Sequence, residues 1–342
     1  MTWRLCSGLF AATLGLWTAV SALAGTPESN WPAWRREYLR PSASQFPDDD
    51  PYTAAKAELG RRLFFDPLLS ASRTQSCASC HNPGLSWGDG LPRAIGDTGK
   101  AMALRAPTLL EVGSLPRLGW DGKFPDLEAV SFAAISGPAN MNLPETEAIA
   151  RLSAIPSYTQ AFAAAFGGDG TITRAKVEQA LATYERTISA GEAPFDRWIA
   201  GDEGAVDSHA KRGFALFNGK AGCSGCHSGW AFTDGSFHDI GTAQGDDIGR
   251  GRLFPTSVKL RYAFKVPTLR DVARRAPYMH DGSVPTLEAV ITLYDRGGIE
   301  RPSRSELIHP LGLSKDEKAD LVAFLRTLTS DPGPVSVPAL PR

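Results

Sequence analysis

The 342-residue chain lacks several features that mark common classes of protein. Its 36 basic and 37 acidic residues nearly cancel, so we expect neither nucleic acid nor an anionic membrane as partner. After residue 24 no run is long and apolar enough to cross a bilayer, which predicts no membrane span. Strand-like alternation is missing over any useful length, which favours a mostly α fold.

The first 24 residues have the pattern of a secretory signal peptide. Arg4 gives the positive start, residues 9–20 are apolar, and an A-x-A cleavage site ends at Ala24. The apolar run is too short to span a bilayer comfortably, so a cleaved signal is preferred to a membrane anchor. We therefore expect a periplasmic protein.

Cysteine is scarce as well, with 5 residues, yet four of them form two copies of the motif C-x-x-C-H. The copies are Cys77, Cys80 and His81, then Cys223, Cys226 and His227. Two thiols one helical turn apart can each bond one vinyl group of a haem, and the adjacent histidine then ligates the iron. The sequence therefore predicts two covalently bound c-type haems.

Three other uses of these cysteines fit less well. The two pairs lie 146 residues apart, whereas zinc knuckles are usually much closer in sequence. Disulfides would suit the periplasm but would leave both following histidines unexplained. A thioredoxin-like redox pair would need a βαβ pattern, which is missing here.

The surroundings of the two motifs also repeat. A proline-threonine-leucine segment follows each motif, an Asp-Gly pair lies fourteen residues past each proline, and Leu-Glu-Ala-Val begins six residues later. The matching prolines, aspartates and leucines are Pro107 and Pro267, Asp121 and Asp281, and Leu127 and Leu287. This repeat predicts two cytochrome c-like haem domains in tandem.

We expect the first domain over residues 51–190 and the second over 191–330. Each would close with an amphipathic helix, at about 174–188 and 315–328, and the second helix has Ser314 as its expected N-cap. The remaining segments are an N-terminal extension over 25–50, a candidate linker at 190–207, and a proline-rich extended tail over 331–342.

The sixth position on each iron decides what a haem can do. Tyr294 lies four residues after the repeated Leu-Glu-Ala-Val in the second half, and Ala134 holds the equivalent place in the first. If Tyr294 ligates its iron, the first iron is open to a small ligand. The alternative is a buried tyrosine that is hydrogen-bonded to backbone.

Few other side chains compete for the irons. Met279 and His280 are alternatives at the second iron, and Met102 and Met141 could close the first. No histidine follows His81 within the first half, so a distal histidine from that domain is excluded.

These features resemble the bacterial diheme cytochrome c peroxidase superfamily, including its MauG-type members, over roughly residues 50–330. Besides the two haem motifs, the segments that carry the resemblance are LGRRLFFDPLL at 59–69, RAPTL at 105–109, WDG at 120–122, PFDRWIAGD at 194–202, FKVPTL at 264–269 and PYMHDG at 277–282. The resemblance implies that Trp120 relays electrons between the haems. It also implies that Tyr294 is an axial ligand, as in MauG-type members, and homodimers are common among relatives.

The chain departs from the family at several positions. Asn140 stands where the family has a catalytic glutamate, and Val130 replaces a family glutamine. Glu145 or Glu147 could reach the site, although a solvated surface role fits both better. The resemblance also implies a calcium ion between the domains, but its ligands are replaced by Arg105 and Arg275, so calcium is doubtful.

The leading interpretation is a peroxide-dependent oxidoreductase. Hydrogen peroxide would react at the first haem, and electrons would arrive at the second. The donor would be a small periplasmic cytochrome c or copper protein, or, in a MauG-type enzyme, a tryptophan or tyrosine of a protein substrate. Tyr294 and the missing distal histidine favour the MauG-type version. A non-catalytic diheme electron carrier or haem sensor is the alternative, and Asn140 favours it.

Overall fold

The computed structural model describes residues 31–44, 46–331 and 333–340. The expected signal peptide and the first residues of the extension lie outside this part. Within it the chain is mostly helical, which confirms the predicted fold class, and none of its helices has the length and apolarity needed to span a membrane. The helices are α1 Trp31–Tyr38, α2 Ala54–Phe65, α3 Cys77–Cys80, α4 Leu127–Ser136, α5 Glu145–Ser153, α6 Pro156–Phe166, α7 Arg174–Glu185, α8 Pro194–Ala200, α9 Ser208–Asn218, α10 Leu287–Arg296 and α11 Lys315–Thr327; the strands are β1 Phe237–His238 and β2 Phe264–Lys265.

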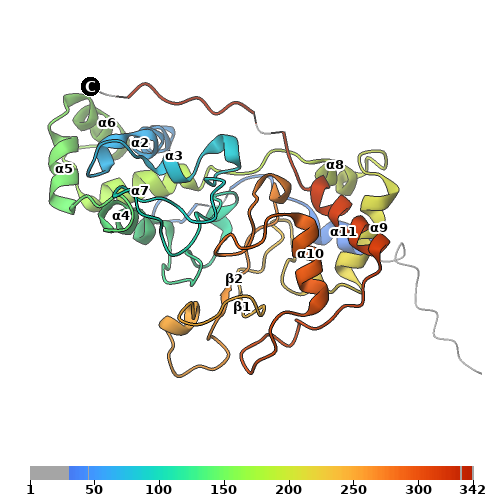
Figure 1. Cartoon of the computed structure of the whole chain (residues 1–342). Helices are drawn as coiled ribbons and strands as arrows, with labels where there is room; N and C mark the ends of the chain where they lie inside the picture. The colour runs from blue at the N-terminus through green and yellow to red at the C-terminus, as the bar shows by residue number, and fades with distance from the viewer. Residues whose placement is uncertain (1–30, 45, 332, 341–342) are drawn as a thin grey trace, which may run out of the picture.

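The helices gather around two separate hydrophobic cores (Figure 1). The first core is built on α2 and α4 to α7, and the second on α8 to α11. Helix α1 joins the second core, because Trp31 packs edge-on against Trp198 and Trp34 against Phe214. The segment expected as a linker contains α8, whose Phe195 and Trp198 are fully buried in the second core. That expectation was wrong. The polar residues after α8 suggested a loop, but the helix before them buries an apolar face.

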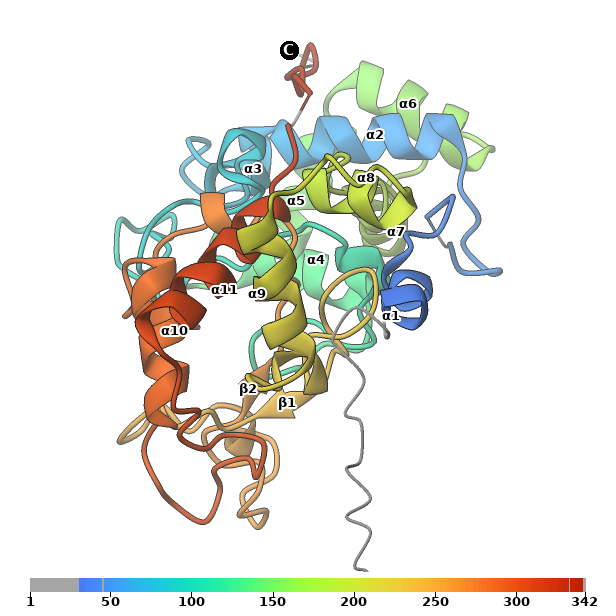
Figure 2. The same ribbon diagram turned by 90° about the vertical axis from the view of Figure 1, so that its right-hand side faces the viewer.

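The repeat seen in the sequence has a structural counterpart in each half. Helix α2 crosses α7 at Gly60, where an added Cβ would lie 1.9 Å from the carbonyl oxygen of Ala180. Helix α9 crosses α11 in the same way at Gly213, with 2.0 Å to the carbonyl oxygen of Asp320 (Figure 2). Only glycine allows such close crossings. The glycine-then-apolar pattern in each half therefore packs α2 against α7 and α9 against α11.

The helices that carry Ala134 and Tyr294 also match. Helices α4 and α10 each have ten residues, and each begins at a side-chain N-cap, Asp126 or Thr286, that accepts a hydrogen bond from the third backbone N–H of its helix. Ser314 caps α11 with a reciprocal hydrogen bond to Glu317, as expected. The local sequence therefore sets where these helices start and which faces they bury.

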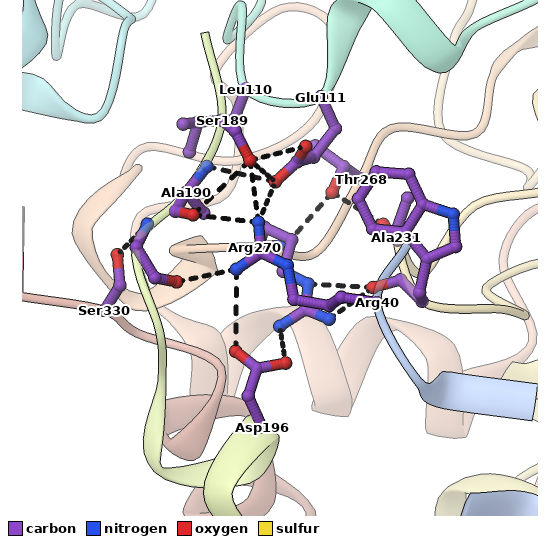
Figure 3. Close-up of polar contacts among 12 residues, drawn as sticks. Arg40, Leu110, Glu111, Ser189, Ala190, Asp196, Ala231, Thr268, Arg270 and Ser330 are labelled. Carbon is purple, nitrogen blue, oxygen red and sulfur yellow. Dashed lines mark hydrogen bonds and ion pairs between the residues drawn. The ribbon is translucent and has the colours of Figure 1, made fainter. Parts of the chain in front are cut away.

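A buried polar network joins the two halves (Figure 3). Arg40, from the N-terminal extension, donates to Glu111 in the first half and to the carbonyl oxygens of Ala190 and Gly191. In the second half, Asp196 pairs with Arg40 at 3.7 Å and with Arg270, which has no exposed side-chain surface, at 2.6 Å. Since a buried charge must be paired to be stable, this network favours one fixed arrangement of the halves.

The C-terminal tail returns from the second half to the first (Figure 1). The carbonyl oxygen of Ser336 accepts a hydrogen bond of 2.9 Å from Arg61 on α2, and Leu340 packs against the first core. No helix or strand is present over 331 and 333–340, as expected for a proline-rich segment.

Candidate haem sites

The two C-x-x-C-H segments share one backbone hydrogen bond, although Cys77–Cys80 is an α-helical turn and Cys223–Gly225 a 3-10 turn. In each, the backbone N–H of the histidine donates 2.9 Å to the carbonyl oxygen of the first cysteine, His81 to Cys77 and His227 to Cys223. In the second motif, Cys223, Cys226 and His227 all line one cavity. The donor set fits a covalently attached haem with a histidine ligand.

Each of these histidines is oriented by a backbone carbonyl. Nδ1 of His227 donates to the carbonyl oxygen of Phe232 at 2.9 Å, and Nδ1 of His81 to that of Trp87 at 3.3 Å. Burial lowers the pKa of both imidazoles, which keeps them neutral. Nε2 is thereby left free as the ligand atom, in the form that binds iron.

The alternatives for the cysteines find no support in the geometry. The four cysteines within the described residues are free thiols, and the two pairs belong to different halves of the molecule. In the part of the chain that the structure covers, no cluster of three or more His, Cys, Asp and Glu side chains could hold a metal ion. Burial raises the pKa of all four thiols, so they are protonated before attachment.

A large apolar cavity surrounds the second motif. Cys223, Cys226 and His227 line it together with Val290 and Tyr294 from α10. Burial raises the pKa of Tyr294 above its ordinary value. Among the described residues, none is hydrogen-bonded to its hydroxyl, which argues against the alternative of a tyrosine held by backbone. The phenol and the imidazole share one cavity, as an axial pair requires.

The competing ligands for this iron are less suited. Nε2 of His280 bonds Asp247 at 2.7 Å, and the ring stacks on Phe264 with centroids 3.7 Å apart. His280 is thus held in a packed, paired position. Met279 lines the cavity, but its backbone φ of 71° places it at a turn rather than on a helix face.

The first site has no counterpart of Tyr294 on α4. Ala134 occupies the equivalent position, and its methyl group cannot ligate iron. Met141 is buried in the first core, and its backbone N–H bonds the carbonyl oxygen of Ala134, while Met102 lies on the loop after the motif. Asn140 lies in the turn that follows α4, where its carbonyl oxygen accepts a hydrogen bond from Asp97 N–H at 2.7 Å.

Trp120 lies at the boundary between the two halves. Its indole N–H donates to the carbonyl oxygen of Arg105 at 3.0 Å, and its own carbonyl oxygen accepts a 2.8 Å hydrogen bond from the backbone N–H of Lys265. Its ring meets His280 edge-on at 6.5 Å, and it lines the second cavity. Arg105 of the first half therefore holds the indole, and Lys265 of the second half holds the backbone of Trp120. The relay role of Trp120 stays a prediction.

Glu185 is a residue that the sequence analysis missed. The matched crossings at Gly60 and Gly213 pair α7 with α11, so Glu185 corresponds to Leu325, which lines the second cavity. Burial raises the pKa of Glu185 to about 8, and one carboxylate oxygen has no hydrogen-bond partner within the described residues. Burial and then this carboxyl raise the pKa of the Cys77 thiol. Comparison of the repeated helices position by position would have found this acid.

Arg105 and Arg275 occupy the positions where the resemblance implied calcium ligands. Nη2 of Arg105 donates to the backbone carbonyl oxygen of Arg275 at 3.0 Å, so the guanidinium of Arg105 lies against the backbone at Arg275. A guanidinium has no acceptor atom and repels a cation. These residues do not fit a calcium ion.

Comparison with known proteins agrees with this geometry. The family model for di-haem cytochrome c peroxidase matches residues 54–204, and the model for cytochrome c matches residues 210–329. The methylamine utilization protein MauG of Methylorubrum extorquens is 46% identical over 98% of this chain and 96% of its own length. The cytochrome c551 peroxidase of Nitrosomonas europaea is 33% identical over 98% of this chain and 95% of its own.

Solved structures give the same picture. A MauG-like protein associated with microbial copper homeostasis superimposes with a TM-score of 0.79 at 31% identity, covering 86% of this chain and 94% of that one. The diheme peroxidase BthA of Burkholderia thailandensis, at 24% identity and a TM-score of 0.72, shares the fold.

Proposed function

The chain belongs to the di-haem cytochrome c peroxidase family that includes MauG, and from that premise we propose that it is a periplasmic oxidoreductase that reduces hydrogen peroxide at its first haem. It is a diheme peroxidase-type enzyme with two c-type haems. The first haem supplies an iron that can react with peroxide, and the second stores and passes on an electron. We assign Cys77, Cys80 and His81 to the first haem.

Cys223, Cys226, His227 and Tyr294 belong to the second haem. The single observation that carries the proposal is the difference between Tyr294 on α10 and Ala134 on α4. As a ligand, the tyrosinate of Tyr294 would close the second iron and favour its oxidised state, whereas Ala134 would leave the first iron accessible. An electron carrier would have both irons closed.

In the proposed reaction, one hydrogen peroxide takes up two protons and two electrons and gives two water molecules. Trp120 positions the electron path between the halves. The electrons come either from a small periplasmic donor or from a tryptophan or tyrosine of a protein substrate, and Tyr294 favours the second, MauG-type version. Asn140 can hydrogen-bond peroxide but cannot move its proton, and a positioned acid–base group typically contributes about 10²–10⁴-fold.

Stopped-flow mixing of the diferric protein with stoichiometric peroxide tests this function. We expect fast changes in the Soret and near-infrared bands. An Ala134→Met variant, which offers a thioether at the first iron, should lose the fast phase, and Ala164→Met, on the exposed side of α6, should keep it. Absence of any change over seconds in the parent protein, even after one-electron reduction, would leave an electron carrier or sensor as the function.

A further inference from the structure

The cavity around the second haem motif has an unusual charge. Four cationic side chains line it, and none of its lining residues is an aspartate or glutamate; the cations are Arg105, Lys265, Arg274 and Arg275. Charged groups are rarely buried unless they are paired. The lining of this cavity therefore has an excess of positive charge, which favours the binding of an anion.

Two of these cations, Arg105 and Arg275, come from different halves of the chain and are joined by a side-chain-to-backbone hydrogen bond. Arg105 is only 9% exposed, although it carries a full charge. Within the described residues neither arginine forms a salt bridge, and the Nε atom of each is buried without a hydrogen-bond partner. Arg275 donates to the carbonyl oxygen of Thr268, and Arg105 to that of Arg275. These carbonyls satisfy part of each guanidinium but supply no negative charge.

The electrostatics of the pair point the same way. Burial and then the neighbouring Arg105 lower the pKa of Arg275 to about 10. Burial lowers the pKa of Arg105 also, and lowers that of Lys265 to about 8. Asp89 raises the pKa of Arg105 and Asp271 raises that of Arg275, but these carboxylates offset only part of the effect of burial. An anion in the cavity would therefore stabilise both charged arginines further.

A haem carries two propionate carboxylates and supplies such an anion. We propose that Arg105, from the first half, and Arg275, from the second, form a fixed dicationic site for haem propionate at the domain boundary, with Lys265 beside it. Guanidinium groups bind carboxylates in a planar, two-point manner. The pair replaces a divalent cation with two permanent charges, so the haem electrostatics of this protein do not depend on calcium.

The site also couples the cofactor to the electron path. The backbone oxygen of Arg105 holds the indole of Trp120, and its side chain reaches into the cavity of the second haem. Its role is therefore positioning and electrostatic rather than catalytic. The proposal rests on the presence of the haems and not on peroxide reactivity, so each can fail without the other.

The test uses the purified diheme protein and equilibrium readouts. Wild-type protein should contain no stoichiometric calcium, and EDTA or added calcium should leave its near-infrared spectrum and both midpoint potentials unchanged. In Arg105→Met and Arg275→Met, loss of a positive charge beside the propionates should lower the midpoint potential of the second haem. Arg326→Gln removes the same charge from an exposed, paired position and should change neither potential.

Arg105→Lys is a control for misfolding of the methionine variants. It keeps the positive charge and loses only the two-point geometry of the guanidinium. It should bind two haems and keep a near-normal potential, but shift the propionate bending bands in the resonance Raman spectrum. Calcium that EDTA removes with a spectral change would overturn the proposal. So would methionine variants with unchanged potentials, or a lysine variant with unchanged propionate bands.

Discussion

Tyr294 and Ala134 occupy the same position, the eighth residue, of two equivalent ten-residue helices. Both helices are preceded by an Asp-Gly turn and packed by a closing helix whose ion pair is also repeated, Arg186 with Glu128 and Arg326 with Glu288. The scaffold is thus the same in both halves. What differs at this position is a phenol in one and a methyl group in the other, and in the proposed function this difference would separate the roles of the two haems.

Replacing Tyr294 by phenylalanine tests its role as a ligand. Loss of the anionic phenolate should raise the midpoint potential of the second haem and change its low-spin spectrum, because the phenolate stabilises the oxidised iron. The fast peroxide phase at the first haem should remain. Spectroelectrochemical titration measures the potential, and Tyr52→Phe, on an exposed tyrosine, is the control. An unchanged potential and spectrum would show that Tyr294 is only a buried aromatic.

Replacing Trp120 by phenylalanine tests the relay. The indole is fixed between the halves by the carbonyl oxygen of Arg105 and lies beside the ring of His280. We expect electron transfer between the haems to slow by about tenfold or more, with both haem spectra unaltered, because the chemistry at the irons is separate from the path between them. Flash reduction followed optically measures this rate. Trp34→Phe on α1 should leave the rate unchanged.

Glu185 should make stability depend on pH. Its folded pKa of about 8 exceeds its ordinary value of 4.5, so between these values the folded chain binds a proton that the unfolded chain has lost. The free energy of unfolding should therefore fall as pH rises through this window, by up to about 1.4 kcal/mol per pH unit. Glu185→Gln should flatten this slope relative to wild type in denaturant titrations. A variant with the same slope as wild type would exclude Glu185 as its source.

Asp196 tests the network that joins the halves. Its carboxylate pairs with the fully buried Arg270, so Asp196→Ala leaves an uncompensated charge. We expect a loss of stability of about 3–5 kcal/mol, the usual cost of breaking one side of a buried pair. Glu306→Ala removes one side of an exposed pair with Lys259 and should cost at most about 1 kcal/mol. Chemical denaturation of both variants gives the comparison, and equal losses would contradict the assigned role of the network.

Much of the fold could be predicted because its signals are local. The C-x-x-C-H spacing, the Ser314 cap and the periodic apolar positions of α7 and α11 depend only on neighbours in sequence. The haem sites follow from the same short motifs. Helix α8 was misjudged because a seven-residue helix between polar residues gives a weak periodic signal, and only tertiary packing of Phe195 and Trp198 makes it part of a core.

The electrostatic features depended on three-dimensional burial. The sequence marks Arg105 and Arg275 as poor calcium ligands, but not that they lie together in a cavity without carboxylates. Glu185 looks like an ordinary charged residue near a helix end, and its raised pKa follows only from its burial. Desolvation is a property of the packed molecule, so no motif encodes it.

Low-temperature electron paramagnetic resonance of the diferric protein tests the asymmetry of the two irons most directly. We predict two signals of equal amount, one high-spin from the open first haem and one low-spin from the second haem with its histidine and tyrosinate ligands. Ala134→Met should convert the first to low-spin, and Tyr294→Phe should alter only the second. Two low-spin signals in the wild-type protein would contradict the account, because both irons would then be closed.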